Sequence, residues 1–276
     1  MRQARSIRWP RLVTHALLIG LSIALLVFAV SDWTLSDAEA YWNAGMRLRE
    51  GQPLYPAVPD PEASTVYRYA PWFAYAAVPV TYLPVEVAAV LWSGLLVAAS
   101  LWAVAPLARR GSAVAALFFG AVLIGISAIG NVQPLIVAAL VHGLERRSGP
   151  LWIAVTASLK VVPALFALVY LGRRQWWRFG ASVALTLLLV APMLLFDLAN
   201  YVTDAADAAL LIRWPPIWVA AVILGAAVTL WAARSRYGWL AAGTAAALAL
   251  PRFFVYDITF LLPGAATKPS AGPDDQ

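Results

Sequence analysis

The sequence predicts an all-α protein that crosses a membrane several times, and three observations support this fold class. Hydrophobic residues make up 62% of the 276 residues and charged residues only 12%, whereas soluble domains have about 25% charged residues. Several apolar runs reach the ~17 to 25 residues that a helix needs to cross a bilayer. Runs such as residues 17–30 show no alternation of polar and apolar positions, which argues against a transmembrane barrel.

Charge and composition exclude several function classes. The net charge is +6, but the basic residues form small clusters between apolar runs. That pattern is typical of topology signals and not of a surface that follows a nucleic-acid backbone. The absence of cysteine excludes disulfides and thiol-based catalysis. The two histidines, His15 and His142, are isolated in the sequence, so we expect neither a metal site nor another cofactor.

Loop arginines indicate the side of the membrane on which each connection lies, because Lys and Arg accumulate in short cytoplasmic loops. The acid-rich segments 31–68 and 197–213 are placed outside. The basic N-terminus leads into an apolar run without a small-residue cleavage site, so we predict a retained first helix. Five basic clusters are placed inside: residues 2–11, 109–110, 146–147, 173–178 and 234–236.

With all five clusters inside, the crossings follow in order. Residues 85–107 supply one crossing, and the proline-broken aromatic segment 69–83 is then an interfacial helix. Residues 112–147 hold two crossings that turn outside at residues 130–134. Residues 151–171 are long enough only for two half-length helices, which turn near residues 160–163 and line a cavity. The later crossings are residues 179–196, 214–233, 237–250 and 253–264.

These segments together predict a single domain, residues 1–264, with about ten transmembrane helices. The first outer loop, residues 31–84, carries juxtamembrane helices in addition. Residues 265–276 are polar and are expected to form a disordered cytoplasmic tail.

The first outer loop contains a helix with an acidic start. Ser36 and Glu39 predict a capping box, so that the helix begins at Asp37 and ends at Gly51. Tyr41 then lies one turn after Asp37 on the same face. The Asp37 carboxylate can act as a general base on a hydroxyl, or it can simply favour the helix dipole. Glu39 is a second acid if it does not cap the helix.

Five short motifs resemble glycosyltransferase family 87 in order and spacing. This family comprises polyprenyl-phosphate-sugar-dependent mannosyl- and arabinofuranosyltransferases of the GT-C fold, and the catalytic subunit of the GPI mannosyltransferase is similar in the same places. The motifs are Asp37-x-x-x-Tyr41, Gly51-x-x-Leu54-Tyr55, Tyr67-Arg68-Tyr69-x-Pro71, Gly130-Asn131-x-Gln133-x-Leu135 and Ser158-Leu159-Lys160-x-x-Pro163.

The resemblance implies a metal-independent transferase in a bacterial inner membrane, with its N-terminus in the cytoplasm and its active site outside. A mannose-like sugar would move with inversion from a polyprenyl phosphate to a lipid or cell-envelope glycan. Asp37 would be the catalytic base. The expected substrate-binding residues are Lys160, which would hold the phosphate, together with Tyr41, Arg68, Tyr69, Asn131 and Gln133.

Other interpretations of these residues and of the chain are open. A lysine between apolar neighbours is costly in lipid and should face a cavity, but Lys160 can also snorkel from a helix end. Arg68 can anchor the loop at the lipid headgroups, and Asn131 and Gln133 can cap helices. A transporter or flippase for lipid-linked sugars would bind the same groups without reacting, and a catalytically inactive scaffold would not need them.

Overall fold

The computed structural model describes residues 9–32, 35–60, 63–201 and 213–267, and within these ranges the chain is helical and contains no strand. This confirms the predicted all-α class. The helices are α1 (Trp9–Asp32), α2 (Ser36–Arg49), α3 (Pro71–Ala77), η1 (Val78–Tyr82), α4 (Val85–Arg110), α5 (Ala113–Ser127), α6 (Gln133–Gly143), α7 (Gly149–Leu159), η2 (Val162–Phe166), α8 (Ala167–Gly172), α9 (Trp176–Val190), η3 (Ala191–Leu195), α11 (Pro215–Ala232), α12 (Gly238–Leu248), η4 (Val255–Leu261) and α13 (Leu262–Ala266).

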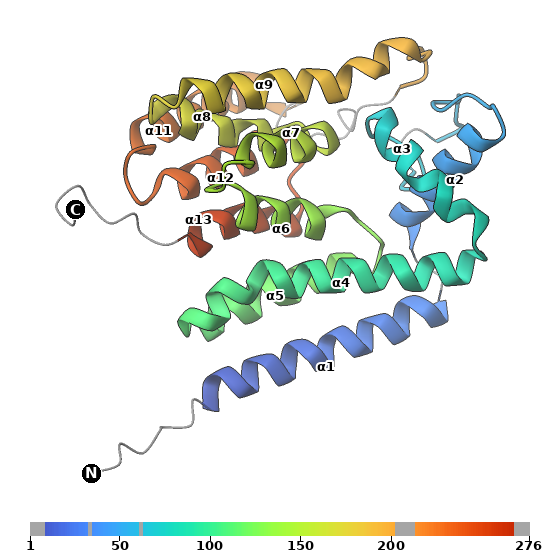
Figure 1. Ribbon diagram of the computed structural model, residues 1–276, viewed down its shortest axis with the longest axis horizontal. Coiled ribbons are helices and arrows are strands. Elements are labelled where there is room, and N and C mark those ends of the chain that lie inside the picture. Colours follow the sequence, from blue (N-terminus) through green and yellow to red (C-terminus); the bar gives the residue numbers. More distant parts are fainter. Residues whose placement is uncertain (1–8, 33–34, 61–62, 202–212, 268–276) are drawn as a thin grey trace.

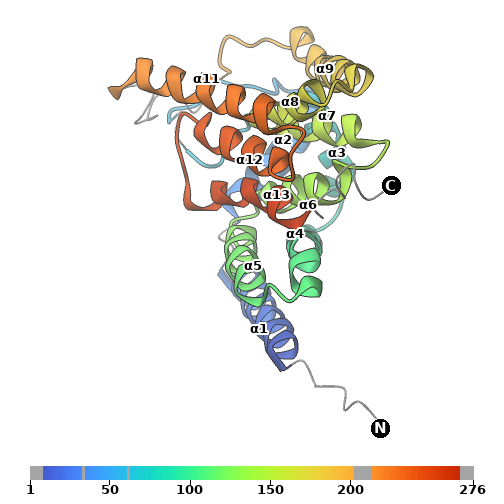
Figure 2. The same cartoon turned by 90° about the vertical axis from the view of Figure 1, so that its left-hand side faces the viewer.

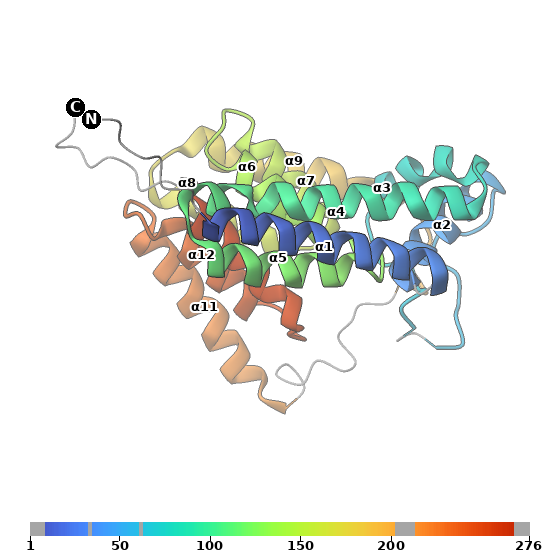
Figure 3. The same ribbon diagram turned by 90° about the horizontal axis from the view of Figure 1, so that it is seen from below.

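The long helices run side by side in three layers (Figure 1). α1 packs on α4 and α5 as one outer layer, which is seen face-on in Figure 3. α6, α7, α12 and α13 form the middle, and α8, α9 and α11 cover the opposite side (Figure 2). The small helices α2 and α3 lie together beyond one end of this bundle. That end carries the candidate site.

Within the described part of the chain, three helical segments are long and apolar enough to cross a membrane: Val85–Arg110, Trp176–Leu195 and Pro215–Ala232. The second and third are only 6% and 17% buried. Apolar helices that the protein leaves uncovered fit a lipid environment, so the chain is a membrane protein. Seven shorter apolar helices in the described residues coincide with the other predicted crossings. One of them, Leu12–Ala24, is part of α1, whose 24 residues are long enough to cross. The other six, at 10 to 17 residues, are shorter than a ~30 Å core requires, and the count of ten transmembrane helices stays a prediction.

The two predicted turns at the site end of the bundle are present. α5 ends at Ser127 and α6 begins at Gln133, with Gly130 between them at φ +78°. α7 ends at Leu159, and Lys160 has an extended backbone with φ −138° and ψ 123°. Pro163 then stands in the first turn of η2, where the missing N–H of proline costs nothing. The half-length helices α7 and α8 therefore flank a backbone break at Lys160.

The predicted capping box at the start of α2 is wrong. Leu35 is the N-cap residue, and no side chain caps the helix. The reason is that backbone carbonyls take the first donors: Asp37 N–H donates to Ile129 O at 3.0 Å and Glu39 N–H to Leu35 O at 2.8 Å. The predicted stop is confirmed, because Gly51 has φ +68° and the N–H of Gln52 reaches back to Arg47 O.

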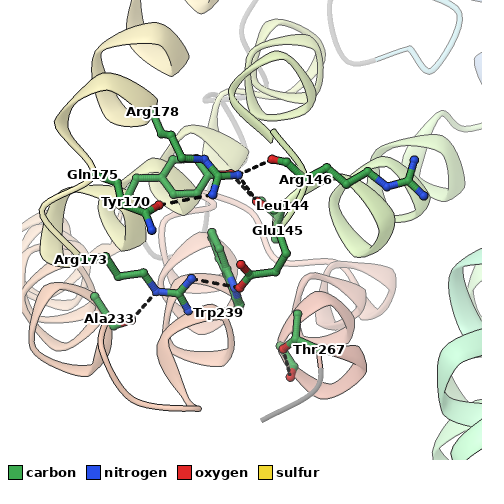
Figure 4. Close-up of polar contacts among 11 residues, drawn as sticks. Leu144, Glu145, Arg146, Tyr170, Arg173, Gln175, Arg178, Ala233, Trp239 and Thr267 are labelled. Carbon is green, nitrogen blue, oxygen red and sulfur yellow. Dashed lines mark hydrogen bonds and ion pairs between the residues drawn. The ribbon is translucent and has the colours of Figure 1, made fainter. Parts of the chain in front are cut away.

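A polar cluster joins the basic loops at the other end of the bundle (Figure 4). Arg173 pairs with Glu145 at 3.0 Å and also donates to Ala233 O at 2.8 Å. Arg178 donates to the carbonyls of Leu144 and Arg146. Three of the predicted inside loops therefore meet through side-chain contacts. The tail predicted from residue 265 overlaps the end of α13, and residues 268–276 lie outside the described part of the chain.

Glu145 gives this cluster a pH dependence. Burial raises its pKa, but hydrogen bonds from Trp239 and Arg173 outweigh that effect and lower it below the ordinary value of 4.5. A lowered folded-state pKa stabilises the fold above the unfolded pKa, and the stabilisation is lost as pH falls through the folded pKa.

We expect Glu145→Gln to lower the thermal unfolding temperature in nanodiscs at neutral pH. The loss corresponds to about 1 kcal/mol, because the pair is partly exposed. The difference from the wild type should shrink as the pH falls below 4.5 and through the lowered folded-state pKa of Glu145. Glu86→Gln, an exposed carboxylate without an ion pair in the described structure, is the matched control. If the unfolding temperatures of Glu145→Gln and the wild type still differed in acid, the stabilising role of the ionised Glu145 would be contradicted.

Candidate active site

Asp37 is fixed in place by the turn between α5 and α6. Its carboxylate Oδ2 accepts a hydrogen bond of 2.5 Å from Asn131 Nδ2. Its backbone N–H is bonded to Ile129 O on the same turn. Two contacts to one turn hold both the helix start and the carboxylate, so Asp37 projects from a rigid position at the end of the bundle.

Gly130 makes this close approach possible. A Cβ added to it would lie 2.6 Å from Ala38 Cβ and 2.9 Å from Ala38 N. Its positive φ is also one that a residue with a Cβ rarely adopts. The carbonyl of Gly130 accepts the indole N–H of Trp92 at 2.8 Å. The turn is therefore locked between α2 and α4.

A chain of hydrogen bonds leads from this turn to Lys160. Asn131 Oδ1 accepts the backbone N–H of Gln133 at 2.8 Å, and Lys160 Nζ donates to Gln133 Oε1 at 3.2 Å. The amide of Gln133 also donates to Thr259 Oγ1 at 3.1 Å. Gln133 is fully buried. The structure thus brings together Asp37, Asn131, Gln133 and Lys160.

Lys160 forms an ion pair with Asp257 at 3.0 Å, with side-chain exposures of 21% and 0%. The second carboxylate oxygen of Asp257 accepts the backbone N–H of Phe254 at 2.8 Å. The ammonium group also lies 4.8 Å from the centre of the Tyr256 ring. A cation that stays partly exposed while a buried carboxylate holds it remains available to an anion.

Tyr41 and Tyr69 lie beside Asp37. The Tyr41 hydroxyl donates to the Tyr69 hydroxyl at 3.1 Å, and its ring packs edge-on against Tyr69, Phe73 and Trp92. Burial first, and then the nearby Tyr69 and Asp37, raise the pKa of Tyr41 well above its usual value of 10.0. Tyr41 therefore stays neutral and remains a hydrogen-bond donor.

Arg68 is oriented by the outer loop. Its guanidinium donates to Ala63 O at 3.2 Å, and its carbonyl accepts the Tyr201 hydroxyl at 3.0 Å. The next helix, α3, is tied to the end of α7 by Trp72 Nε1, which donates to Ser158 Oγ at 3.0 Å. The loop helices thus lie over the break that carries Lys160. The roles predicted for Arg68 and the other site residues stay predictions.

A cavity of about 580 Å³ adjoins this group, between α2, the α3–η1 segment and the start of α4. Its walls include the aromatic rings of Tyr41, Phe73 and Trp92. Tyr41 is one turn from Asp37, and Trp92 touches the turn that holds Asn131. The cavity therefore reaches Tyr41, one helical turn from the candidate base, and Asp37 itself is not among the described residues that line it.

The sequence matches glycosyltransferase family 87 over residues 67–255, which is more than half of the chain. The chain belongs to glycosyltransferase family 87. It is accordingly a glycosyltransferase, as its motifs indicated. No curated protein and no solved structure matches it.

The family match covers some of the candidate site residues of this glycosyltransferase and not others. Arg68, Tyr69, Asn131, Gln133 and Lys160 lie inside the matched segment, whereas Asp37 and Tyr41 precede it. The hydrogen bond from Asn131 connects the Asp37 carboxylate to the matched part. The tertiary structure, and not the match, places Asp37 beside the matched segment.

From the sequence, Asp257 is expected to pair with Arg252 in the last apolar region, and it is not among the predicted site residues. The structure pairs it with Lys160. A signal for it was present: an aspartate inside an apolar segment needs a partner, as does a lysine in another. The two lysines of the chain are Lys160 and Lys268, and only Lys160 lies within an apolar segment. Arg252, five residues before Asp257 in the same segment, is the nearer cation in the sequence, so the sequence does not identify Lys160 as the partner of Asp257.

We expect Gly130→Ala to destabilise the fold by about 1 to 3 kcal/mol, because of its positive φ and the contact with Ala38. The transfer rate should fall by more than the loss of folded protein explains, because Asn131 would shift away from Asp37. Gly125→Ala is the control, because that helical glycine has open space around it. Thermal unfolding and transfer rates in nanodiscs measure both effects. If Gly130→Ala and Gly125→Ala had the same unfolding temperature and transfer rate, the role of Gly130 in holding the turn against α2 would be contradicted.

Proposed function

We propose that this glycosyltransferase moves a sugar from a polyprenyl phosphate to a hydroxyl of a lipid or cell-envelope glycan, with inversion. The observation that supports this is the chain of contacts from the Asp37 carboxylate through Asn131 and Gln133 to the Lys160 ammonium. A base and a cation held at one end of the bundle are the two groups that such a displacement needs.

In the proposed reaction the acceptor hydroxyl gives its proton to Asp37 while its oxygen attacks the anomeric carbon. The bond from that carbon to the phosphate oxygen breaks, and polyprenyl phosphate leaves with the electron pair. Lys160 stabilises the negative charge that appears on the phosphate. Neutral Tyr41 donates a hydrogen bond near the reacting groups, and the proposed reaction takes place without a metal ion or cofactor.

The surroundings of Lys160 suit this role. Asp257 and Gln133 hold the ammonium group through Oδ1 and Oε1, so the lysine is already oriented before an anion arrives. Preorganised charge costs no rearrangement during the reaction. A phosphate would approach from the exposed side of Lys160, while Asp257 remains buried behind it.

The proposed setting is a bacterial inner membrane, with the site on the outer face and the basic loops in the cytoplasm. The separation of α2 and α3 from the Glu145 cluster at opposite ends of the bundle agrees with this orientation. The positive loops would then obey the usual cytoplasmic bias.

We expect Asp37→Asn to reduce transfer at least ~100-fold, the lower range for loss of a general base. The amide keeps the size of the side chain but cannot accept the proton. Membranes containing the protein receive labelled polyprenyl-phosphate mannose and a crude envelope acceptor, and labelled product is counted. Asp60→Asn, an exposed carboxylate in the same loop, should transfer normally. Unchanged transfer in Asp37→Asn would exclude Asp37 as the base.

We expect Lys160→Gln to raise the apparent KM for the donor about 10-fold to 100-fold, the value of one lost charge-assisted hydrogen bond. Lys160→Arg should restore part of the affinity, because it returns the charge. Donor titrations at fixed acceptor concentration measure the change. An effect confined to the acceptor KM would refute phosphate binding by Lys160. Movement of lipid-linked sugar across vesicles without its consumption would favour a flippase.

A further inference from the structure

Lys160 is paired with a carboxylate that is fixed on both of its oxygens. Asp257 Oδ1 lies 3.0 Å from Lys160 Nζ, and the Asp257 side chain is 0% exposed. Asp257 Oδ2 accepts the backbone N–H of Phe254 at 2.8 Å, at the N-cap of η4. A buried carboxylate with both oxygens engaged does not follow the ammonium group when that group turns toward a ligand. Asp257 is therefore a stationary negative charge beside Lys160.

The other neighbours of the Lys160 ammonium group are uncharged. Gln133 Oε1 accepts a hydrogen bond from it at 3.2 Å, and the ring centres of Tyr256 and Phe260 lie 4.8 Å and 5.8 Å from it. Asp257 is the one carboxylate within ion-pair distance of Lys160 in the described part of the chain. An anion that binds Lys160 must share the ammonium group with Asp257, and the same carboxylate repels it.

The two phosphates of the proposed reaction differ in charge. The phosphate of the sugar donor is a diester with a single negative charge. The leaving polyprenyl phosphate is a monoester, whose second pKa is about 6, so that it carries close to two negative charges at neutral pH. A lysine without a counter-charge would hold this product more tightly than the donor. Product release limits the turnover of many enzymes, so a group that offsets the difference speeds the reaction.

We propose that Asp257 is a positioning residue that weakens the hold of Lys160 on the leaving phosphate and so promotes release of polyprenyl phosphate. This role rests on the proposed function, in which Lys160 binds the phosphate. The fixed carboxylate repels an anion at Lys160 in proportion to its charge, and therefore disfavours the product more than the donor. When the phosphate leaves, Asp257 again pairs with the ammonium group. Asp257 lies beyond residues 67–255, so the family match does not cover it.

Phosphate binding to Asp257→Asn tests the sign of the effect. The full chain in phosphatidylcholine nanodiscs is titrated with octyl phosphate, a monoester like the product, and with octyl methyl phosphate, a diester like the donor. Calorimetry measures binding, and empty nanodiscs are the blank. We expect Asp257→Asn to bind octyl phosphate at least ~10-fold more tightly than the wild type, and the diester more tightly by a smaller factor. Replacement of a merely structural residue would weaken the binding of both ligands.

Matched variants separate charge from shape. Asp197→Asn makes the same replacement at an exposed position, where the amide can still accept the N–H of Ala199, and it should bind both ligands as the wild type does. Asp257→Glu keeps the charge and should not bind octyl phosphate more tightly than the wild type.

Gln133→Glu provides the opposite test if Asp257→Asn does not fold. This variant places a second carboxylate at the contact between residue 133 and Lys160. We expect octyl phosphate to bind about 10-fold more weakly than in the wild type, and octyl methyl phosphate to be weakened by a smaller factor, because the repulsion depends on the charge of the ligand. Equal weakening of the two ligands would overturn the proposal.

Transfer kinetics give a second readout for Asp257→Asn. The value of kcat and the donor KM should fall together, because donor and product are both held more tightly. Added polyprenyl phosphate should inhibit transfer at a concentration at least ~10-fold lower than in the wild type. A higher donor KM with unchanged product inhibition would overturn the release role, since that result is expected for the loss of a structural contact.

Lys160→Gln separates this inference from the proposed function. If Lys160→Gln loses octyl phosphate binding while Asp257→Asn binds it no more tightly than the wild type, Lys160 remains the phosphate-binding group and the release role of Asp257 is overturned. If Lys160→Gln binds octyl phosphate as the wild type does, the proposed function loses its cation and the release role falls with it. Tighter binding in Asp257→Asn together with unchanged transfer in Asp37→Asn would support the release role and exclude the proposed base.

Discussion

The ion pair between Lys160 and Asp257 is the contact around which the site end of the bundle is organised. A charged group inside an apolar helical protein must have a partner, and this pair joins the break after α7 to the start of η4, nearly a hundred residues later. Gln133, on α6, accepts a hydrogen bond from Lys160 and donates one to Thr259, so α6 is connected to the ion pair. The C-terminal part of the chain is thereby tied to the middle.

Helix interruptions, and not long helices, position the functional groups. Lys160 lies where α7 stops and the backbone becomes extended, Asn131 follows the left-handed Gly130, and Asp37 begins the short helix α2. Non-helical backbone at membrane depth is tolerated where protein or a cavity surrounds it. The fold thus concentrates its irregular backbone at one end, where the polar groups satisfy one another.

The two ends of the bundle have different chemistry. One end holds arginines bonded to carbonyls and to Glu145, which fasten the loops between helices. The other end holds one lysine, two aspartates and a wall of aromatic rings beside a cavity. The first arrangement leaves its cations engaged with the backbone, while the second leaves Lys160 partly exposed and Glu39 without a partner in the described structure. The second arrangement is the one that we propose for substrate binding.

The sequence by itself determined the all-α membrane class, the turns at residues 130–134 and 160–163, the stop at Gly51 and the family. These depend on local signals: apolar length, proline, glycine and motif order. The tertiary structure decided that Asp257 partners Lys160, that Asn131 holds Asp37, and that backbone carbonyls replace the expected capping box, which leaves Glu39 facing a cavity. Such contacts join residues far apart in the chain, and no local pattern encodes which buried polar groups will meet.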